Sequence, residues 1–195
     1  LTESVGVDGD VTVLPNGIDL DRFRPVETAD FRRRHDLGQD PLVGYTGRHG
    51  YEKRLRDAVD AVARVDATLV FGGDGPARDD LEARAAEPGV DARFLGFLDR
   101  GDLPAFYSAL DAFVFPSPVE TQGLVALEAI ACGTPVVAAD EGALAATVVD
   151  GETGYHFPTG DVAALARTIR RTLDERESLG GQCLDRREEY GVERA

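Results

Sequence analysis

One stretch of the chain reads Asp111-Ala-Phe-Val-Phe-Pro-Ser-Pro-Val-Glu-Thr-Gln-Gly-Leu-Val-Ala-Leu-Glu-Ala-Ile-Ala-Cys-Gly133. It begins with a short apolar run that ends in proline and closes with a longer apolar run, 123–132, of helical length. The stretch therefore predicts a strand, a turn and a helix in that order. The first N–H groups of such a helix, near Gly123 and Leu124, have no partner inside it and carry partial positive charge. The turn thus suits an anion such as a pyrophosphate.

Two carboxylates, Glu120 and Glu128, flank the start of this helix with seven residues between them. Glu128 lies four residues past Leu124, which is about 6 Å along a helix axis. Cysteine aside, it is the only ionisable side chain between Thr121 and Ala139. A lone carboxylate in so apolar a stretch is costly unless a partner hydrogen-bonds it, and the cis-diol of a ribose is well suited to that role.

Strand and helix patterns alternate along the rest of the chain. Apolar runs of strand length occupy 11–14, 42–45, 68–71, 93–95, 112–115, 135–138 and 155–157, and helical patterns occupy 29–35, 54–65, 77–86, 103–110, 124–132 and 143–149. This alternation predicts an α/β fold in which a Rossmann-like, doubly wound parallel sheet is flanked by crossover helices. Two more helices are predicted, over 161–176 and from Ser178 onward. We expect residues 1–177 to form the ligand-binding domain and residues 178–195 to form a C-terminal helical tail.

The predicted sheet also places the site. In an open parallel sheet, ligands bind beyond the carboxyl ends of the strands. Those ends are followed here by Gly47, Gly72, Gly96, Ser117 and Ala139. We expect the functional residues along this rim.

Two cations stand on that rim in the segment 47–53, which reads Gly-Arg-His-Gly-Tyr-Glu-Lys. Arg48, as a planar fork, and Lys53, as a compact charge, suit the two sides of a pyrophosphate. Lys53 is the only lysine of the chain, which favours a specific role because the composition uses arginine elsewhere. The alternative is an ordinary solvated pair in which Lys53 bridges Glu52.

Four motifs in matched order resemble those of the retaining family-4, or group 1, glycosyltransferases, which have the two-domain GT-B fold. They are the pair of glutamates described above, Pro-Asn-Gly-Ile-Asp at 15–19, Gly-Arg-His-Gly-Tyr-Glu-Lys at 47–53 and Gly-Asp-Gly-Pro at 73–76. The similarity runs from about residue 11 to residue 157, which makes it far more specific than a single short motif. It implies that the chain is the C-terminal, nucleotide-sugar-binding half of such an enzyme. The acceptor would then bind a missing N-terminal domain, against which the tail after Ser178 is expected to pack.

The resemblance also implies roles for single residues. Glu120 would contact hydroxyls of the donor sugar, Glu128 would hold the ribose, and the amides of Gly123 and Leu124 would meet the distal phosphate. Without the resemblance, Glu120 is simply an acid near the positive end of a helix. Gln122 stands where the family commonly has an aromatic residue, so the identity of the donor sugar is left open.

The turn at 73–76 and the loop around Phe97 belong to the same implied donor site. Gly75 either allows close backbone approach to the donor or merely turns a strand into a helix with proline at its first position. A dinucleotide-binding motif is excluded because Arg78 occupies the position of its third glycine. Phe97 and Leu98 match the loop that receives the base, and the alternative for Phe97 is a place in the core.

The composition is strongly acidic, with 36 acidic residues against 21 basic ones and a net charge of −15. Nucleic acid is excluded as a partner, because its phosphates would be repelled. Such an acid-rich, lysine-poor surface suits a halophilic protein, since a Debye length of about 3 Å at 1 M salt screens the self-repulsion. The alternative is an acidic protein from a GC-rich genome, which also prefers arginine codons.

The sequence predicts no transmembrane segment, because it has no run of eighteen apolar residues, and no signal peptide is visible. Cys132 is expected to pack as a small hydrophobe, which suits a reducing interior, and we expect a cytoplasmic location. Because the chain has no methionine and starts at Leu1, we expect it to be part of a longer protein. Peripheral membrane association through the other half stays open.

No metal or cofactor is predicted. The triplets 8–10 and 19–21 have the Asp-x-Asp form that binds metal in the other major transferase fold, but here we interpret them as loop residues. The histidines lack the spacing of metal ligands.

The sequence thus predicts a glycosyltransferase that moves a sugar from a nucleoside diphosphate sugar, a UDP or GDP sugar, to a hydroxyl acceptor with retention. Arg48, Lys53 and Glu120 are the predicted catalytic residues, and their main task is to stabilise the leaving diphosphate. The isolated domain is expected to be inactive. Two alternatives stay open, a nucleotide-sugar-binding subunit without transfer activity and a nucleotide-sugar 2-epimerase of the same fold.

Overall fold

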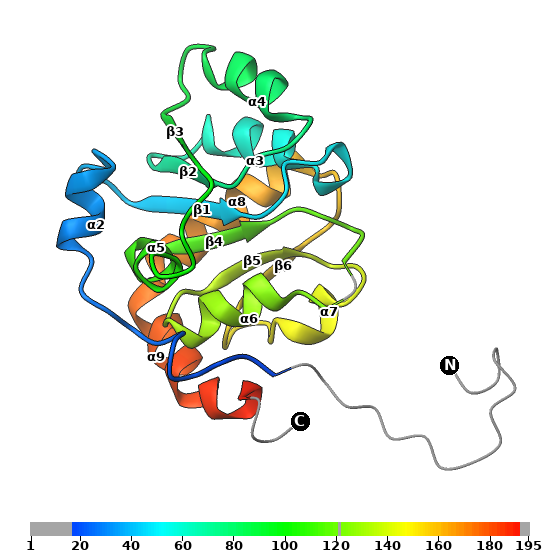
Figure 1. Cartoon of the computed structure of the whole chain (residues 1–195). Coiled ribbons are helices and arrows are strands. Elements are labelled where there is room, and N and C mark those ends of the chain that lie inside the picture. The colour runs from blue at the N-terminus through cyan, green and yellow to red at the C-terminus, as the bar shows by residue number, and fades with distance from the viewer. Residues whose placement is uncertain (1–16, 121, 192–195) are drawn as a thin grey trace, which may run out of the picture.

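A computed structural model describes residues 17–120 and 122–191 (Figure 1). Its centre is a six-stranded parallel sheet in the order β3-β2-β1-β4-β5-β6. The strands are β1 (Leu42–Thr46), β2 (Thr68–Gly72), β3 (Ala92–Gly96), β4 (Ala112–Phe115), β5 (Val136–Ala139) and β6 (Gly154–Phe157). The strand order reverses between β1 and β4, so the sheet is doubly wound. The predicted α/β, Rossmann-like fold class is confirmed.

Helices cover both faces of the sheet. They are α2 (Ala29–Arg34), α3 (Leu55–Val62), α4 (Arg78–Ala85), α5 (Leu103–Ala109), α6 (Leu124–Ala131), α7 (Leu144–Thr147), α8 (Val162–Asp174) and α9 (Arg176–Arg186), with two 3₁₀ turns, η1 (Tyr51–Lys53) and η2 (Arg187–Tyr190). Figure 1 shows α5 and α6 in front of the sheet and α8 behind it, where α8 packs on α3. The loops that follow the strands therefore lie at the carboxyl edge of the sheet, between the two helical layers.

The core explains why the strands read as continuous apolar runs. Every residue of β1, β2, β4 and β5 is buried, because helices cover both faces of these strands. Aromatic side chains fill the centre, and the ring of Tyr45 stacks at 6.1 Å on that of Phe113. The strand β3 at the sheet edge is only half-buried throughout. The four central strands thus form the rigid part that carries the loops of the rim.

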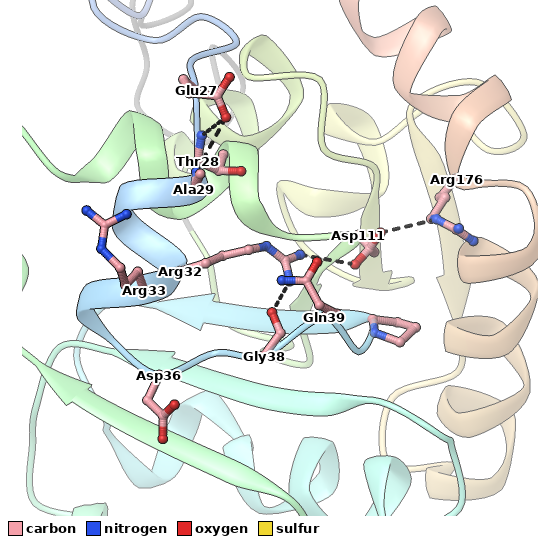
Figure 2. A pocket seen from close by; sticks show the side chains of 11 residues that line it. Glu27, Thr28, Ala29, Arg32, Arg33, Asp36, Gly38, Gln39, Asp111 and Arg176 are labelled. Carbon is pink, nitrogen blue, oxygen red and sulfur yellow. Dashed lines mark hydrogen bonds and ion pairs between the residues drawn. The ribbon is translucent and has the colours of Figure 1, made fainter.

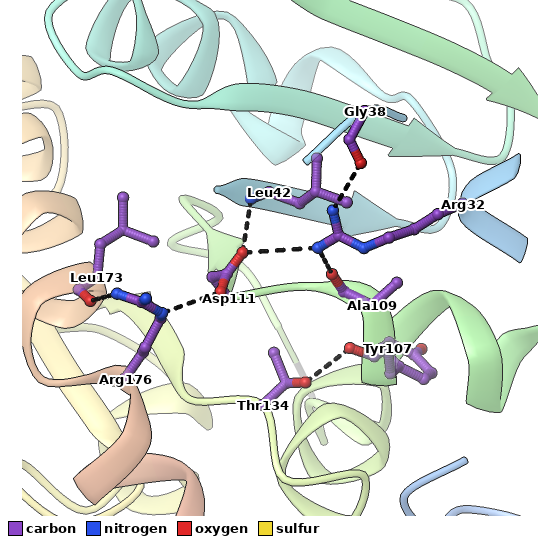
Figure 3. A network of polar contacts seen from close by, with 9 residues as sticks. All are labelled: Arg32, Gly38, Leu42, Tyr107, Ala109, Asp111, Thr134, Leu173 and Arg176. Carbon is purple, nitrogen blue, oxygen red and sulfur yellow. Dashed lines mark hydrogen bonds and ion pairs between the residues drawn. The ribbon is translucent and has the colours of Figure 1, made fainter. Parts of the chain in front are cut away.

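At the amino edge of the strands, one carboxylate joins segments that are far apart in the sequence (Figure 3). Asp111, which directly precedes β4, accepts a 2.8 Å hydrogen bond from the backbone N–H of Leu42 at the start of β1. Its carboxylate also forms ion pairs, at 3.8 Å with Arg32 of α2 and at 3.2 Å with Arg176 at the start of α9. This network connects β1, β4, α2 and α9 at the edge of the sheet opposite to the predicted site.

The structure shifts several predicted boundaries. The predicted helix 54–65 is shorter, because α3 spans only Leu55–Val62. Arg54, between η1 and α3, adopts a left-handed conformation with φ 53°. The last helix begins at Arg176 rather than Ser178, and it packs on α6 with Leu179 and Cys183 buried. The predicted strand 11–14 lies outside the described residues. Packing of the tail on an N-terminal domain stays a prediction.

Candidate donor-binding site

The loop after β1 carries both predicted cations. β1 ends at Thr46, the chain turns through Gly47, and η1 delivers Lys53 directly before the left-handed residue Arg54. The guanidinium of Arg54 forms a two-point ion pair with Asp57, at 2.8 Å from Nε and 2.7 Å from the terminal nitrogen. The ion pair with Asp57 stabilises the left-handed conformation of Arg54, which is unfavourable for a residue other than glycine.

The loop after β2 packs tightly on the loop after β1. The backbone N–H of His49 donates to the carbonyl oxygen of Asp74 at 2.8 Å, and the N–H of Ala77 donates to the carbonyl oxygen of His49 at 2.9 Å. A Cβ atom on Gly75 would lie 2.6–2.8 Å from backbone atoms of His49. Glycine is therefore required here for the contact between the two loops, in addition to any approach of a ligand.

His49 itself is buried between these loops. Its Nε2 lies 3.2 Å from the carbonyl oxygen of Gly72, and burial lowers the pKa of its imidazole. The His49 side chain thus connects the loop after β1 to the end of β2.

A cavity of about 690 Å³ opens beside these loops. Its wall brings together five predicted site residues, which are Gly47, Arg48, Gly75, Phe97 and Leu98. Thr46, Gly73, Asp74 and Leu103 complete the lining. Phe97 is 84% exposed, so the alternative that placed its ring in the core is wrong.

Lys53 and Glu120 form an ion pair across the rim. The distance from Nζ of Lys53 to Oε2 of Glu120 is 2.9 Å, and each side chain is 18% exposed. The ammonium group also lies 5.9 Å from the ring centroid of Phe115, the last residue of β4. Since β1 and β4 are neighbours in the sheet, the loops that follow them bring these two residues together.

The alternative in which Lys53 bridges Glu52 is wrong. Glu52 instead pairs with Arg48 at 2.5 Å, and these two side chains are 40% and 62% exposed. Both predicted phosphate-binding cations therefore contact carboxylates of the chain, Lys53 at a half-buried position and Arg48 at the surface.

The start of α6 faces the same rim. Gly123 precedes the helix with φ 65°, a left-handed conformation that favours glycine, and it packs close to Leu144 of α7. Leu124, the first residue of α6, is 36% exposed. The first N–H groups of a helix lack carbonyl partners one turn earlier, and binding of an anion at this end of α6 stays a prediction.

Glu128 lies one turn further along α6 and has a partner that the sequence interpretation missed. The hydroxyl of Tyr107 in α5 donates a 2.6 Å hydrogen bond to Oε2 of Glu128. Burial raises the pKa of the Glu128 carboxyl, and the bond from Tyr107 together with the charges of Arg100 and Arg22 opposes that rise. The carboxylate is thus held in a partly desolvated position.

Tyr107 had no separate signal in the sequence, because it reads as one more apolar residue of the helical pattern 103–110. Its side chain is fully buried and packs edge-on to Phe113 at 5.7 Å. The one available indication was that a lone glutamate in an apolar helix needs a buried hydrogen-bond donor.

A second cavity, of about 640 Å³, lies at the opposite, amino edge of the strands (Figure 2). Charged side chains of α2, together with Asp111 and Arg176, line it, and they contact one another. Arg32 also donates to the carbonyl oxygens of Gly38 and Ala109. No predicted motif reaches this cavity, and two of its lining residues, Arg32 and Arg176, belong to the network around Asp111.

Among residues 17–120 and 122–191, no group of three or more His, Cys, Asp or Glu side chains is arranged to hold a metal ion. Asp19, from one Asp-x-Asp triplet, accepts hydrogen bonds from the backbone N–H groups of Asp21 and Arg22, both at 3.1 Å. The triplet 8–10 lies outside the described residues. In the same part of the chain, no helix is long and apolar enough to span a membrane.

A doubly wound parallel sheet with two cations, a glycine turn and the start of α6 at its carboxyl edge defines a Rossmann-like α/β domain. The chain belongs to a particular family of this class, because residues 27–188 match the family described as glycosyl transferases group 1. The predicted family is therefore confirmed.

A curated relative and two solved structures agree with this assignment. The chain is 38% identical to 2-deoxystreptamine glucosyltransferase of Streptomyces kanamyceticus over 95% of its length and 52% of the relative's. It superimposes with a TM-score of 0.83 on sucrose-phosphate synthase of Thermosynechococcus elongatus, at 35% identity, over 92% of its length and 48% of that chain's. It thus spans about half of each of these proteins.

The other structure is the C-terminal domain of the group 1 family protein LpcC of Francisella tularensis. Here the TM-score is 0.80 at 26% identity, and the match covers 90% of this chain and 100% of that one. The chain therefore corresponds in extent to a C-terminal domain of the family.

Proposed function

We propose that this chain is the donor-binding half of a retaining glycosyltransferase that moves a sugar from a nucleoside diphosphate sugar to a hydroxyl acceptor. The observation that carries the proposal is the convergence of Arg48, Lys53, Glu120 and the start of α6 on one edge of the sheet, beside the cavity lined by Gly75 and Phe97 and Leu98. Family membership supports sugar transfer, and the residues themselves support a diphosphate and a ribose.

Each group has a task in this proposal. Arg48, Lys53 and the first N–H groups of α6 neutralise the charge that develops on the leaving diphosphate, which is the main electrostatic demand of the reaction. Glu128 accepts hydrogen bonds from the ribose diol, and Glu120 accepts them from hydroxyls of the sugar. In retaining members of the family, the departing phosphate is thought to help deprotonate the acceptor on the same face. The proposal therefore assigns no separate base to these residues.

The acceptor site is proposed to lie on an N-terminal domain, because the relatives are about twice as long as this chain. The two alternatives predict other outcomes for a protein that carries both halves. A binding subunit would form no product, and a 2-epimerase would form an epimerised sugar nucleotide. We also propose a cytoplasmic location, which the two buried, free cysteines support.

Binding is tested first. Calorimetry should show that the chain binds UDP or GDP without added metal, and Arg48→Ala and Lys53→Ala should each weaken that binding by about 1.5–3 kcal/mol. Arg33→Ala is the matched control for Arg48→Ala, because Arg33 is also an exposed arginine paired with a nearby acid, Asp30, but at the opposite edge. Wild-type affinity in both site variants would contradict the proposed phosphate site.

Transfer is tested next. The 195-residue chain should bind the nucleotide but transfer no sugar, whereas a protein with both halves should form a glycoside that retains the anomeric configuration of the donor. Robust transfer by this chain alone would contradict the two-half proposal. An epimerised sugar nucleotide as the product would establish the alternative enzyme.

A further inference from the structure

The ammonium group expected to bind phosphate already contacts an anion of the chain itself. Lys53 and Glu120 are 2.9 Å apart, and their side chains are only 18% exposed. We propose that Glu120 is an internal competitor for Lys53, and that this competition makes the site prefer a sugar-bearing diphosphate over the plain diphosphate left after transfer. This inference rests on the proposed function and deepens it.

The ion pair of Lys53 with Glu120 lies in a half-buried position, where water screens it little. Lys53 ends η1, whereas Glu120 lies in the loop after β4, and the ring of Phe115 lies 5.9 Å from the ammonium. Low exposure and a neighbouring aromatic ring lower the local dielectric, so charges interact more strongly here than in water. An arriving diphosphate must therefore displace or share a substantial interaction.

The other cation offers a comparison within the same site. Arg48 and Glu52 are four positions apart in the sequence, and their side chains are 62% and 40% exposed. Exposed pairs of this kind contribute little, since water screens them. The pair of Lys53 with Glu120 is thus the one that determines which anion binds well.

The two ligands differ in what they offer to Glu120. When a plain diphosphate binds Lys53, it brings more negative charge close to the half-buried carboxylate of Glu120, and the phosphate oxygens are chiefly acceptors. A sugar conjugate takes Lys53 in the same way, but its hydroxyls can donate to the carboxylate. The same carboxylate therefore weakens the binding of the product diphosphate and strengthens that of the donor, which favours product release.

Calorimetry with three probes tests the inference: inorganic pyrophosphate, UDP or GDP, and the matching UDP-glucose or GDP-mannose. In Glu120→Gln, the plain diphosphates should bind about tenfold more tightly than to the wild type, and the preference for the sugar conjugate should fall by at least as much. The matched control is Glu52→Gln, which removes the same charge from the exposed pair and should change these affinities less than about threefold.

A double-variant cycle separates competition for Lys53 from general repulsion. In a Lys53→Ala background, Glu120→Gln should no longer tighten pyrophosphate binding. Because Lys53 is the only lysine, its side chain gives a single set of NMR signals in lysine-labelled protein, and these signals should move both on pyrophosphate addition and on Glu120→Gln.

The outcomes are distinct. Unchanged or weaker pyrophosphate binding in Glu120→Gln, or an equal gain in the Lys53→Ala background, overturns the inference and leaves the proposed function standing if the wild type binds the nucleotides. A wild-type chain that binds none of the nucleotides contradicts the proposed function itself.

Discussion

At the scale of single residues, the contact between Tyr107 and Glu128 gives the site its clearest geometric feature. One carboxylate oxygen of Glu128 accepts a hydrogen bond from the buried phenol of Tyr107, and this contact restricts the rotamer of the glutamate side chain. We infer that Tyr107 is a positioning residue for the carboxylate that the proposal assigns to the ribose.

Tyr107→Phe tests that positioning role. The variant keeps the buried ring but removes the hydroxyl, so affinity for a ribonucleoside diphosphate should fall by about 0.5–1.5 kcal/mol while affinity for the 2′,3′-dideoxy analogue stays the same. Tyr155→Phe is the matched control, because the hydroxyl of Tyr155 also donates to a glutamate, Glu175, but far from the site. An equal loss for both ligands would show a merely structural role.

The pH dependence of ribose recognition follows from the raised pKa of Glu128. The diol donates to the ionised carboxylate, so recognition is complete above that pKa and is lost as the pH falls through it. Because burial raises the pKa, this loss should begin above the range in which an ordinary glutamate, with a pKa of 4.5, takes up a proton. The ratio of ribonucleotide to dideoxynucleotide affinity, measured across pH, isolates the effect from titration of the phosphates.

Two variants check the assignment of that titration. In Glu128→Gln the ratio should be low and independent of pH. In Tyr107→Phe the loss should move to higher pH, because the bond from Tyr107 lowers the pKa of Glu128. A ratio that is flat with pH in the wild type would contradict the ribose role.

At the scale of elements, the site depends on two loops that lock together. The loop after β1 supplies Arg48 and Lys53, and the turn after β2 presses on it through Gly75 and the backbone of His49. Neighbouring parallel strands deliver both loops to the same edge, so the alignment of the cations depends on this contact.

Gly75→Ala should therefore disturb both stability and binding. The added Cβ would lie 2.6–2.8 Å from the backbone of His49, so the two loops would have to move apart. We expect the free energy of unfolding, measured by urea denaturation, to fall by about 1–3 kcal/mol and diphosphate binding to weaken. Gly101→Ala is the control, because a Cβ there meets nothing within 4 Å. If the two variants are equally stable, the loop contact is not tight.

At the scale of the whole molecule, charge is the dominant feature. With a net charge of −15, the excess acidic side chains repel one another at low salt. The ion pairs that salt would weaken are mostly exposed or half-exposed, and each contributes little to stability. The stability that salt adds by screening the repulsion should therefore exceed the stability that it removes by weakening the ion pairs.

Thermal stability should accordingly rise with potassium chloride between about 0.1 M and 1 M, where the Debye length falls from about 10 Å to 3 Å. A variant with several exposed aspartates changed to asparagine, such as Asp66, Asp79 and Asp99, should show a smaller rise. A melting temperature that falls with salt would show that the ion pairs dominate.

The sequence by itself determined the fold class, the positions of all six described strands and the edge of the sheet that carries the motifs. These features follow from local patterns, because apolar runs of strand length and amphipathic helical runs specify elements over a few residues. The turn before α6 and the place of Arg48 and Lys53 after β1 were predicted from the same local patterns, whereas the left-handed conformation of Gly123 was not. The boundaries were less certain where tertiary contacts intervene, as at Arg54 and Arg176.

Only the tertiary structure decided which of these residues meet. Lys53 contacts Glu120 rather than Glu52 because β1 and β4 are neighbours in the sheet, although 67 residues separate the pair in the sequence. Glu128 contacts Tyr107 because α5 and α6 pack on the same face. The local pattern around each residue carries no information about strand order or about which helix faces which, so partners distant in the chain become visible only when the sheet is assembled.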